Sequence, residues 1–407
     1  MKTTAAVIDF GTSKIVTAIA DTGTFSRFDI RGTGTVPYAG YQDGEWIEPI
    51  ELKNRIKDSI TAAEYEAHVN IKEIFVSVPA DRLHVKLADA EIDVSSEDGK
   101  LSEQDMDLVE DACADLLEKT SQVIIHRSPA WFSVDGGKKT MTPLKNMSLK
   151  RAGMIRGLTS FITVDAAYVK EMRELFASLN IEVRGFVSSA MSDALMYIDP
   201  TERDKTQALV DVGYLNTEFS VVEGDALVFH KVLPVGGGLI TADIAENLGL
   251  SMESAEKIKR EFSFSYDDLA DKLPQYDAFE DGLRYSFDYV TVANAMDQTC
   301  VELIDGLSQA IEEAGTALAS KAVIYLTGGG IAGMKGASNW LAEQLDYEVK
   351  TVRGQSSKLS GYGFTSVLSE LDSVFGAIEQ ITQTEQSLPG RLVSGMKSFL
   401  RKDHGPA

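Results

Sequence analysis

Residues 5–20 read AAVIDFGTSKIVTAIA, in which an acidic turn containing a glycine separates two apolar runs. The runs at 5–10 and 15–20 have the length and the β-branched content of buried strands. Within the turn, Gly11 permits a tight bend, and the backbone N–H groups together with the hydroxyls of Thr12 and Ser13 can face phosphate oxygens. We therefore expect an α/β fold that opens with a strand, a phosphate-binding turn and a second strand.

Two charged residues of this turn suit a bound phosphate. Lys14 can offset the negative charge of phosphate, and Asp9, at the end of the first strand, can hold a hydrated Mg²⁺. An ordinary polar hairpin explains the turn about equally well when it is taken alone. The functional interpretation therefore needs a matching feature elsewhere in the chain.

The second half of the chain supplies that match. Residues 208–212 and 217–222 again form two apolar runs around an acidic turn, and residues 211–218 read DVGYLNTE. The candidate phosphate-binding residues of this turn are Asp211, Gly213, Asn216 and Thr217. Two such turns, one in each half, are what a nucleotide held between two similar domains requires. The repeat predicts an internal duplication.

Two glycine runs and one helix extend the candidate site. The glycines at 236–238 precede a helix, whose N-terminal N–H groups are predicted to bind an anion. The glycines at 328–330 offer backbone without side chains, against which a flat base can lie. A helix at 252–261 carries Glu256 and Lys259 on one face, and an ordinary surface ion pair is the alternative interpretation of these two residues.

The composition of the whole chain is that of a globular protein. Its 407 residues are enough for two to four domains, and 44% are hydrophobic and 25% charged. The formal net charge of −23 argues against nucleic-acid binding, because a phosphate-binding surface needs an excess of Lys and Arg. Two cysteines are too few for a disulfide framework, and the histidines show no metal-ligand spacing. With no signal-peptide pattern and no apolar run of about 18 residues, we expect a cytoplasmic chain without a transmembrane helix.

From about residue 82 to residue 164 the sequence pattern changes. Alternating residues at 84–94, a helix opened by the capping box of Ser102 and Asp105, and short strands near 123–126 and 131–134 predict an inserted subdomain. Elsewhere we expect helices at 51–64, 166–179, 189–198 and 252–261, and strands at 74–78, 181–187, 227–234 and 322–326. We also expect mostly helices at 252–319 around a polar interruption at 267–281, helices from the last glycine run to residue 381, and a polar linker at 380–387.

Together, these motifs resemble those of the actin, Hsp70 and sugar-kinase superfamily, and within it those of the FtsA family of bacterial cell-division proteins. The phosphate-1 motif of that family is similar to residues 9–14, the phosphate-2 motif to 211–218 and the adenosine motif to 326–336. Residues 82–164 lie where FtsA proteins carry subdomain 1C in place of subdomain 1B of actin. The resemblance covers almost the whole chain.

The resemblance implies an α/β, actin-like (ribonuclease H-like) fold with duplicated domains, an inserted subdomain 1C and a C-terminal amphipathic helix. The implied divisions are subdomain 1A at 1–83, 165–203 and 365–379, subdomain 1C at 84–164, subdomain 2A at 204–250 and 320–364, subdomain 2B at 251–319, a linker at 380–387 and a membrane-targeting helix at 388–402.

The resemblance also implies ATP or ADP, with Mg²⁺, as the cofactors. Glu256 and Lys259 would contact the ribose and adenine, the glycines at 328–330 with Met334 would bracket the nucleoside, and Asp9 and Asp211 would organise Mg²⁺. The complete candidate set is Asp9, Gly11, Thr12, Ser13, Lys14, Asp211, Gly213, Asn216, Thr217, Gly236, Gly237, Gly238, Glu256, Lys259, Gly328, Gly329, Gly330 and Met334.

The phosphate-2 turn departs from the family pattern, which has two further glycines after Gly213 and an Asp near its end. This chain has Tyr214, Leu215 and Glu218 at those places. Side chains as large as Tyr and Leu must point away from the phosphates or narrow the γ-phosphate space, and they resist φ values that are open to glycine. We therefore expect ATP binding with weak or absent hydrolysis, no catalytic residue and no substrate chemistry.

Residues 388–402 predict an amphipathic helix. At 100° per residue, its apolar side chains gather within about 140° of arc and its cations occupy the remainder. Four Lys and Arg residues against Asp403 give the balance expected of a helix on anionic lipid, whereas docking on the parent domain is the structural alternative. The candidate membrane-contacting residues are Leu388, Leu392, Val393, Met396, Lys397, Phe399, Leu400, Arg401 and Lys402.

As partners, the resemblance implies FtsZ, the cell-division tubulin homologue, whose C-terminal peptide would bind subdomain 2B, and later division proteins. The chain would assemble into filaments on the cytoplasmic face of the inner membrane at the division site. Family members often carry an Arg on the FtsZ-facing helix, where this chain has Gln298 or Thr299. An ATP-dependent sugar kinase and a chaperone-like ATPase share the same core, and the terminal helix favours a membrane adaptor over both.

Overall fold

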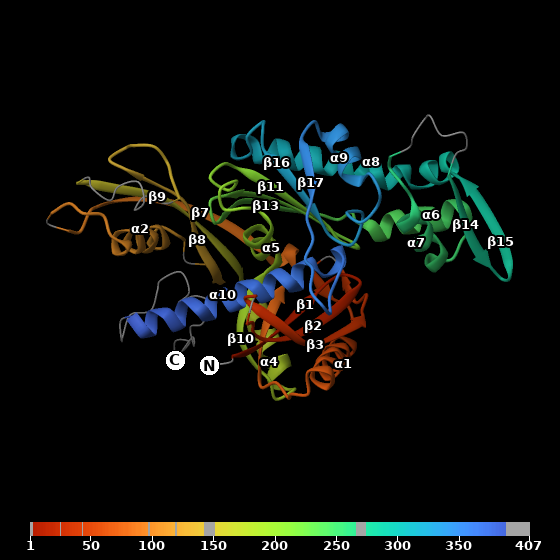
Figure 1. Ribbon diagram of the computed structural model, residues 1–407, viewed down its shortest axis with the longest axis horizontal. Coiled ribbons are helices and arrows are strands. Elements are labelled where there is room, and N and C mark those ends of the chain that lie inside the picture. The colour runs from red at the N-terminus through yellow and green to blue at the C-terminus, as the bar shows by residue number, and fades with distance from the viewer. Residues whose placement is uncertain are drawn as a thin grey trace.

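The computed structural model describes residues 3–24, 26–42, 44–96, 98–118, 120–141, 151–265 and 274–387 and, for residues 380–387, the backbone alone. Two halves lie one above the other, with an inserted subdomain at one end of the long axis and a β-hairpin at the other (Figure 1). Within these residues, no helix is both long enough and apolar enough to cross a bilayer.

Each half is built on a five-stranded sheet, and the two sheets share one topology. In each sheet three consecutive strands form an antiparallel meander, and two later strands extend the sheet in parallel beyond the first of them. The first sheet has the order β10-β6-β1-β2-β3 and the second β13-β12-β11-β16-β17. The predicted duplication and the α/β class are therefore confirmed.

The bounds of the sheet strands are as follows. The first sheet comprises β1 (Thr4–Phe10), β2 (Lys14–Thr22), β3 (Phe28–Pro37), β6 (Glu73–Val78) and β10 (Glu182–Ser188). The second comprises β11 (Gln207–Val212), β12 (Thr217–Glu223), β13 (Ala226–Leu233), β16 (Val323–Thr327) and β17 (Glu348–Thr351).

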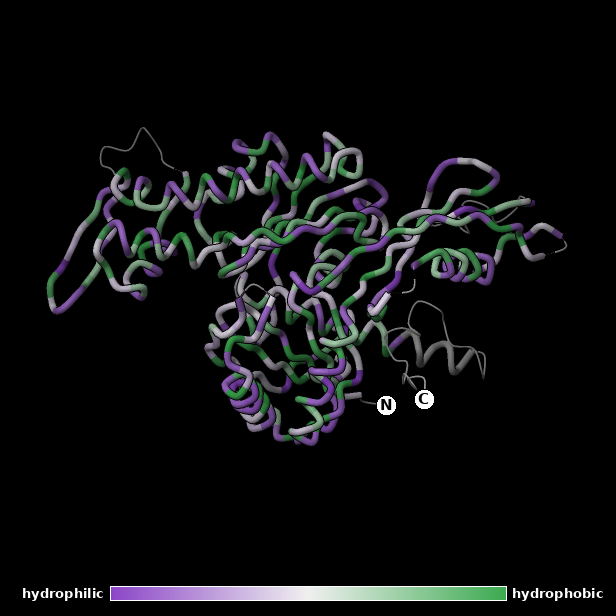
Figure 2. The backbone as a smooth tube through the Cα atoms, turned by 180° about the vertical axis from the view of Figure 1, so that it is seen from behind, coloured by the Kyte–Doolittle hydropathy of each residue, from purple (hydrophilic) through white to green (hydrophobic). Residues whose placement is uncertain are grey.

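Helices cover both faces of the first sheet, which explains why its strands read as nearly continuous apolar runs. Alternate residues of β1 point to opposite layers: Ile8 belongs to the core that contains Ile56 of α1 (Pro49–Ala67), and Val7 to the core that contains Leu371 of α10 (Thr365–Ser387). Figure 2 shows hydrophobic segments concentrated in the central strands of both halves. Helices α4 (Ala166–Ala177) and α5 (Ser189–Tyr197) complete this half, with the short elements β4 (Tyr41–Gln42), β5 (Glu45–Trp46) and η1 (Ala80–Arg82).

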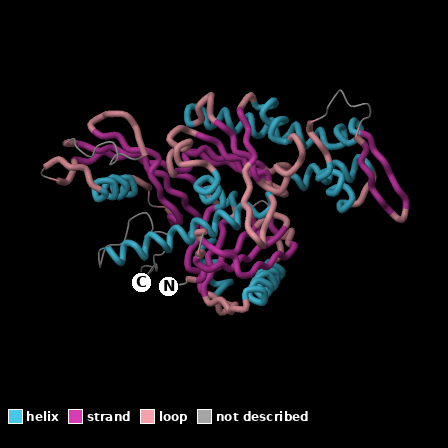
Figure 3. Tube along the Cα trace, viewed as in Figure 1, coloured by secondary structure: helices cyan, strands magenta, loops and turns pink. Residues whose placement is uncertain are grey.

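In the second half, one core lies between the sheet and the helices, whereas Leu209, Val222 and Tyr325 of the same sheet belong to the core that contains Ile8 and Ile56 of the first half. These helices are α6 (Gly237–Leu248), α7 (Met252–Glu261), α8 (Tyr289–Ala314) and α9 (Ala337–Leu345), with the single turns η2 (Gly315–Ala317) and η3 (Tyr362–Phe364). In Figure 3, α10 runs as a long helix along the lower half and toward the side on which the inserted subdomain lies.

The inserted subdomain is a three-stranded antiparallel sheet with one helix. Its elements are β7 (His84–Asp93), α2 (Glu103–Asp115), β8 (Gln122–Val134) and β9 (Met154–Asp165), in the sheet order β7-β9-β8. The capping box is confirmed, because the N–H of Ser102 donates to Asp105 Oδ2 at 2.8 Å. The two short strands predicted at 123–126 and 131–134 are one strand, β8, whose pairing shifts register twice. Those irregularities break the alternation and made one strand read as two.

Three further features of the secondary structure were not predicted. Strand β3 was not predicted because Gly32 and Gly34 interrupt its apolar pattern; they allow the strand to lie against the backbone of α1. The region expected to be mostly helical contains the hairpin of β14 (Gln275–Glu280) and β15 (Leu283–Asp288), whose turn is Asp281-Gly282, both with positive φ. The last region expected to be helical contains the edge strand β17, whose exposed residues give no apolar pattern.

The linker predicted at 380–387 is helical, because α10 continues to Ser387. Its Gln and Glu residues favour helix, and extending an existing helix avoids the cost of nucleation. The predicted membrane-targeting helix at 388–402 lies outside the described residues.

Arg203 connects the two halves from a buried position. Its guanidinium, in a residue that is 5% exposed, donates to the carbonyls of Leu195 and Ile198 at the end of α5 and pairs with Asp225 between β12 and β13. One side chain thus satisfies the last carbonyls of a helix in the first half and a carboxylate in the second.

Replacing Arg203 by alanine is expected to lower the free energy of unfolding by about 3 kcal/mol, because the carbonyls at the end of α5 lose their hydrogen-bond donor and the carboxylate of Asp225 loses its ion-pair partner. Urea denaturation measures this change. Arg284→Ala is the matched control, since the Arg284–Asp277 pair is largely exposed and its loss is expected to leave the midpoint unchanged. Equal midpoint shifts in the two variants would contradict the assignment.

Candidate functional site

A cavity of about 520 Å³ lies between the two halves. The β1–β2 turn and the β11–β12 turn enter it from opposite sheets, and α7, the glycine run after β16 and the segment before α10 complete its wall. Most of the predicted nucleotide-binding residues line it: Asp9, Gly11, Thr12, Ser13, Lys14, Asp211, Gly213, Asn216, Glu256, Lys259, Gly328, Gly329, Gly330 and Met334. The sequence therefore located the cavity, although the binding itself stays a prediction.

The two turns have the same local structure. The N–H of Gly11 donates to the carbonyl of Lys14 at 3.0 Å, and the N–H of Gly213 donates to the carbonyl of Asn216 at 2.9 Å. They also meet directly, because the N–H of Leu215 donates to Thr12 Oγ1 at 3.0 Å. This bond crosses the cleft and ties the two halves together at the β1–β2 and β11–β12 turns.

Tyr214 and Leu215 fit the second turn without backbone strain. Neither residue has a positive φ, so the replacement of glycine does not force a left-handed conformation here. The Tyr214 ring packs at the start of α6, where a Cβ on Gly238 would lie 2.7 Å from the ring carbon Cζ. Gly238 therefore makes room for the tyrosine, which turns much of its bulk toward α6 while still lining the cavity.

The glycines at 236–238 do not form the predicted anion site. The N–H groups of Gly237 and Gly238 donate to the carbonyls of Gly213 and Tyr214, at 2.9 and 2.7 Å. The start of α6 is thus capped by the phosphate-2 turn, and these donors are already used. Thr217 is also directed away from the cavity, because it is fully buried and its hydroxyl donates to the carbonyl of Val235 at 2.7 Å.

Glu256 and Lys259 are a built part of the cavity wall and not a surface ion pair. Lys259 is 1% exposed, and its Nζ lies 2.7 Å from Glu256 Oε2 and donates to the carbonyl of Gly237 at 2.8 Å. Glu256 also accepts from the hydroxyl of Thr241 and pairs with Arg260, which is on the exposed side. This network holds α7 against the start of α6.

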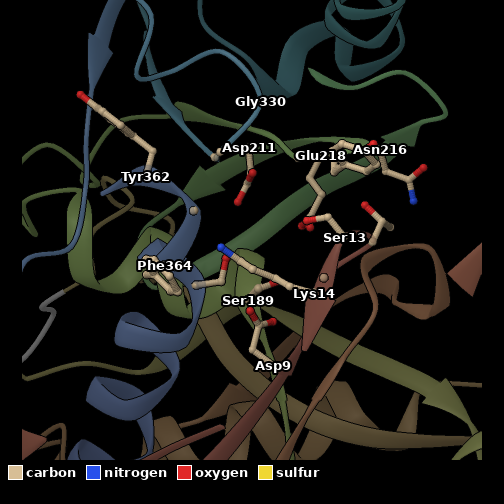
Figure 4. Close-up of a pocket in the computed structure, with 18 of the residues that line it drawn as sticks. Asp9, Ser13, Lys14, Ser189, Asp211, Asn216, Glu218, Gly330, Tyr362 and Phe364 are labelled. Carbon is tan, nitrogen blue, oxygen red and sulfur yellow. The ribbon is translucent and has the colours of Figure 1, made fainter. Parts of the chain in front are cut away.

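Carboxyl groups from both halves face the cavity. Figure 4 shows Asp9, Asp211 and Glu218 directed, with Lys14, toward one space. Burial raises the pKa of Asp9 to about 6, although Lys14 opposes the shift, and burial together with the charge of Asp9 raises the pKa of Asp211 to about 7. Burial, followed by the charge of Asp211, raises the pKa of Glu218 well above its usual value.

These carboxyls suit a hydrated divalent cation better than a directly ligated metal. In the described ranges, no three His, Cys, Asp or Glu side chains are arranged to hold a metal ion. Asp9 and Asp211 nevertheless present buried carboxyls from opposite halves, and their raised pKa values mean that burial disfavours the charged forms, a cost that a nearby cation would offset. Mg²⁺ typically takes one or two carboxylates and completes its shell with water and phosphate, which fits this pair.

The raised pKa values predict how stability depends on pH. Between about pH 4 and about pH 7 the folded chain retains protons on Asp9 and Asp211 that the unfolded chain has released, so the free energy of unfolding falls as pH rises through this window. We expect the nucleotide-free protein to melt at a higher temperature at about pH 5.5 than at about pH 7.5. The variant Asp211→Asn, which lacks one of these two carboxyls, controls for the general effect of net charge. If its melting temperature depended on pH as strongly as that of the unaltered chain, the assignment of the pH dependence to this pair would be contradicted.

The sequence analysis did not identify the segment before α10. Ser360, Tyr362 and Phe364 line the cavity, as does Ser366 at the start of α10. Tyr362 packs against Gly333, where a Cβ would lie 3.2 Å from its ring. These residues stand more than 300 positions from the first turn and carry no periodic pattern of their own. Only the tertiary fold brings them to the site.

Comparison with known proteins agrees with this architecture. Residues 208–369 match the family model described as "Cell division protein FtsA". A "Cell division protein FtsA" from Bacillus subtilis (strain 168) is 23% identical over 310 residues, which cover 76% of this chain and 69% of that protein. Another from Borreliella burgdorferi is 22% identical over 377 residues, covering 91% of this chain and 89% of that protein.

Solved structures show the same fold at low identity. The structure titled "PilM-PilN type IV pilus biogenesis complex" matches with a TM-score of 0.58 and 16% identity, over 91% of this chain and 98% of that chain. MreB5 of Spiroplasma citri bound to ADP matches with a TM-score of 0.54 and 11% identity, over 93% and 98%. These likenesses establish an actin-like fold.

Proposed function

Because this chain belongs with the FtsA-type cell-division proteins of the actin-like ATPase superfamily, we propose that it binds ATP between its halves and assembles into filaments that attach the division machinery to the cell membrane. Within this proposal, residues 388–402 bind the cytoplasmic face of the membrane. Subdomain 2B, at 251–319, receives the C-terminal peptide of FtsZ.

One observation carries the nucleotide part of the proposal: two equivalent turns from two equivalent sheets open onto one cavity. Lys14 and the hydroxyl of Ser13, both from the first turn, line the cavity and suit a polyphosphate. The glycine run after β16, Met334 and the Glu256–Lys259 pair form the opposite part of the wall and suit a nucleoside. The MreB structures named as bound to ADP and to AMPPNP support nucleotide binding by analogy of fold.

Mg²⁺ would be held by Asp9 and Asp211 and would supply positive charge to the β- and γ-phosphates. Lys14 would add a second cation from the same side. The Thr12–Leu215 hydrogen bond closes the turns over the phosphate region. This arrangement favours a nucleotide that joins the two halves and thereby stabilises one relative orientation of them.

We expect slow hydrolysis because of the second turn and not because a base is lacking. The pKa values of Asp9 and Asp211, about 6 and about 7, are close to those of effective general bases at neutral pH. Tyr214 lines the cavity at a place where glycine would leave more open space for an attacking water.

The structure of α8 favours one of the two residues considered for contact with the FtsZ peptide. Gln298 is exposed and hydrogen-bonds Glu302, whereas Thr299 is 4% exposed and its N–H donates to Asp243. Of the two positions considered for a partner contact, only Gln298 can reach a peptide on the surface of α8.

Electron microscopy of the full chain on anionic lipid monolayers, with a parallel phosphate-release assay, tests the proposed function. We expect filaments with ATP and equally with a non-hydrolysable analogue, and phosphate release slower than about one per minute per chain. Rapid Mg²⁺-dependent phosphate release, or phosphoryl transfer to a sugar, would instead indicate an ATPase or a kinase.

A further inference from the structure

The ammonium of Lys14 rests on an aromatic ring. Its Nζ lies 3.9 Å from the centroid of the Phe364 ring, and Figure 4 shows the lysine extended toward Phe364 above Asp9. Gly363 lies against the same ammonium, because a Cβ there would be 2.9 Å from Nζ. The segment before α10 thus provides both a ring for the cation and a gap in which the cation fits.

Lys14 has an alternative partner that it does not use. Asp9 is near enough for its charge to influence the pKa of Lys14, yet in the part of the chain that the structure describes the two groups form no ion pair. A lysine and a carboxylate that are both buried attract each other strongly, and such a pair would neutralise the two groups that a nucleotide with its cation requires. Another contact of Lys14 must therefore keep its ammonium apart from the carboxyl of Asp9.

An aromatic face can provide this preference. A cation over a ring is attracted by the ring quadrupole, most strongly where water is excluded, and it keeps its N–H groups available for other acceptors. A carboxylate partner would use those N–H groups instead. A ring therefore holds the ammonium and leaves it competent to bind phosphate.

We propose that Phe364 is a positioning residue, whose ring holds the Lys14 ammonium in the middle of the cavity and away from Asp9. Lys14 then meets the phosphates, while Asp9 stays open to the hydrated cation. This inference rests on the proposed nucleotide binding and extends it to a residue outside the phosphate and adenosine motifs. The same ring stands at the entry to α10, since Thr365 begins that helix.

Nucleotide titrations of full-length variants, with Mg²⁺ and with a chelator in its place, test the proposal. Phe364→Leu keeps an apolar side chain but loses the ring, so Lys14 is expected to close on Asp9 and the affinity for Mg²⁺ and ATP to fall about tenfold. The difference in affinity between the Mg²⁺ and chelator conditions is expected to shrink in this variant. Phe364→Trp keeps a ring and is expected to retain affinity within about twofold.

A double-mutant cycle with Lys14→Met distinguishes a positioning role of Phe364 from a packing role. If Phe364 acts through Lys14, Phe364→Leu changes the affinity less than about twofold in the Lys14→Met background. Equal losses in both backgrounds would overturn the proposal in favour of a packing role. Gly363→Ala leaves the ring in place and puts a methyl group where the ammonium lies, so it is expected to weaken Mg²⁺-dependent binding as well. Melting curves confirm that each variant is folded.

The outcomes also distinguish this inference from the proposed function. If the unaltered chain binds no ATP under either condition, the proposed function fails and the positioning role fails with it. If the unaltered chain binds ATP and Phe364→Leu binds it equally well, only the positioning role fails.

Discussion

Removal of residues 387–407 is expected to abolish pelleting of the protein with anionic vesicles, the largest effect that the account predicts. The removed segment contains the apolar stripe and the four cations at 388–402 in a chain whose net charge is −23. Each Lys or Arg near an anionic surface contributes about 1 kcal/mol, and the apolar stripe adds to this attraction. Cosedimentation of the full chain and the truncation after Gln386 measures the difference.

Two controls identify the cause of that loss. Replacing both Leu392 and Phe399 by glutamate keeps the length of the segment but disrupts its apolar stripe, so this variant is expected to behave as the truncation does. Vesicles without anionic lipid are expected to pellet little of the full chain. Equal pelleting of the full chain and the truncation would show that the segment is not the anchor.

Lys259→Met is expected to cause the second large effect, a fall of about 3 kcal/mol in the free energy of unfolding together with a loss of at least about tenfold in ATP affinity. Lys259 is almost fully buried, and its loss leaves the carbonyl of Gly237 and the carboxylate of Glu256 without their shared donor. Chemical denaturation and nucleotide titration measure the two changes.

Arg260→Gln is the matched control for stability. Arg260 pairs with the same Glu256, but its side chain is 74% exposed, so its removal is expected to leave the unfolding midpoint nearly unchanged. If Lys259→Met were as stable as the unaltered chain, the interpretation of Lys259 as the buried link between α7 and α6 would be wrong.

The elements that the sequence predicted correctly share a physical cause. Strands β1, β2, β11 and β12 are buried on both faces or nearly so, which leaves continuous apolar runs, and the turns between them must carry glycine and charge. The same sequence pattern in both halves therefore identified the fold and the two turns that enter the cavity. Local patterns were sufficient here because burial on both faces leaves its mark on each strand's own residues.

Other parts of the site depend on contacts that no local pattern encodes. The sequence suggested that the N–H groups of Gly237 and Gly238 are free to bind an anion. In the structure they donate to the carbonyls of Gly213 and Tyr214 instead. Phe364 reaches Lys14 across 350 positions of the chain, and an isolated aromatic residue beside a glycine gives no sign of such a contact. Strands β15 and β17 were missed because their residues are mostly exposed and lack an apolar alternation.

Calorimetric titration of the full chain with ATP and Mg²⁺, beside the variant Gly330→Val, tests whether a nucleotide binds between the two halves. Any Cβ on Gly330 would approach the carbonyls of Gly213 and Val212, at 2.5 and 2.7 Å, and would push the glycine run off the phosphate-2 turn. The account predicts saturable binding of one nucleotide per chain and its loss in the variant. Absence of binding by the folded, unaltered chain, or undiminished binding by a folded Gly330→Val, would contradict a nucleotide site between the two halves.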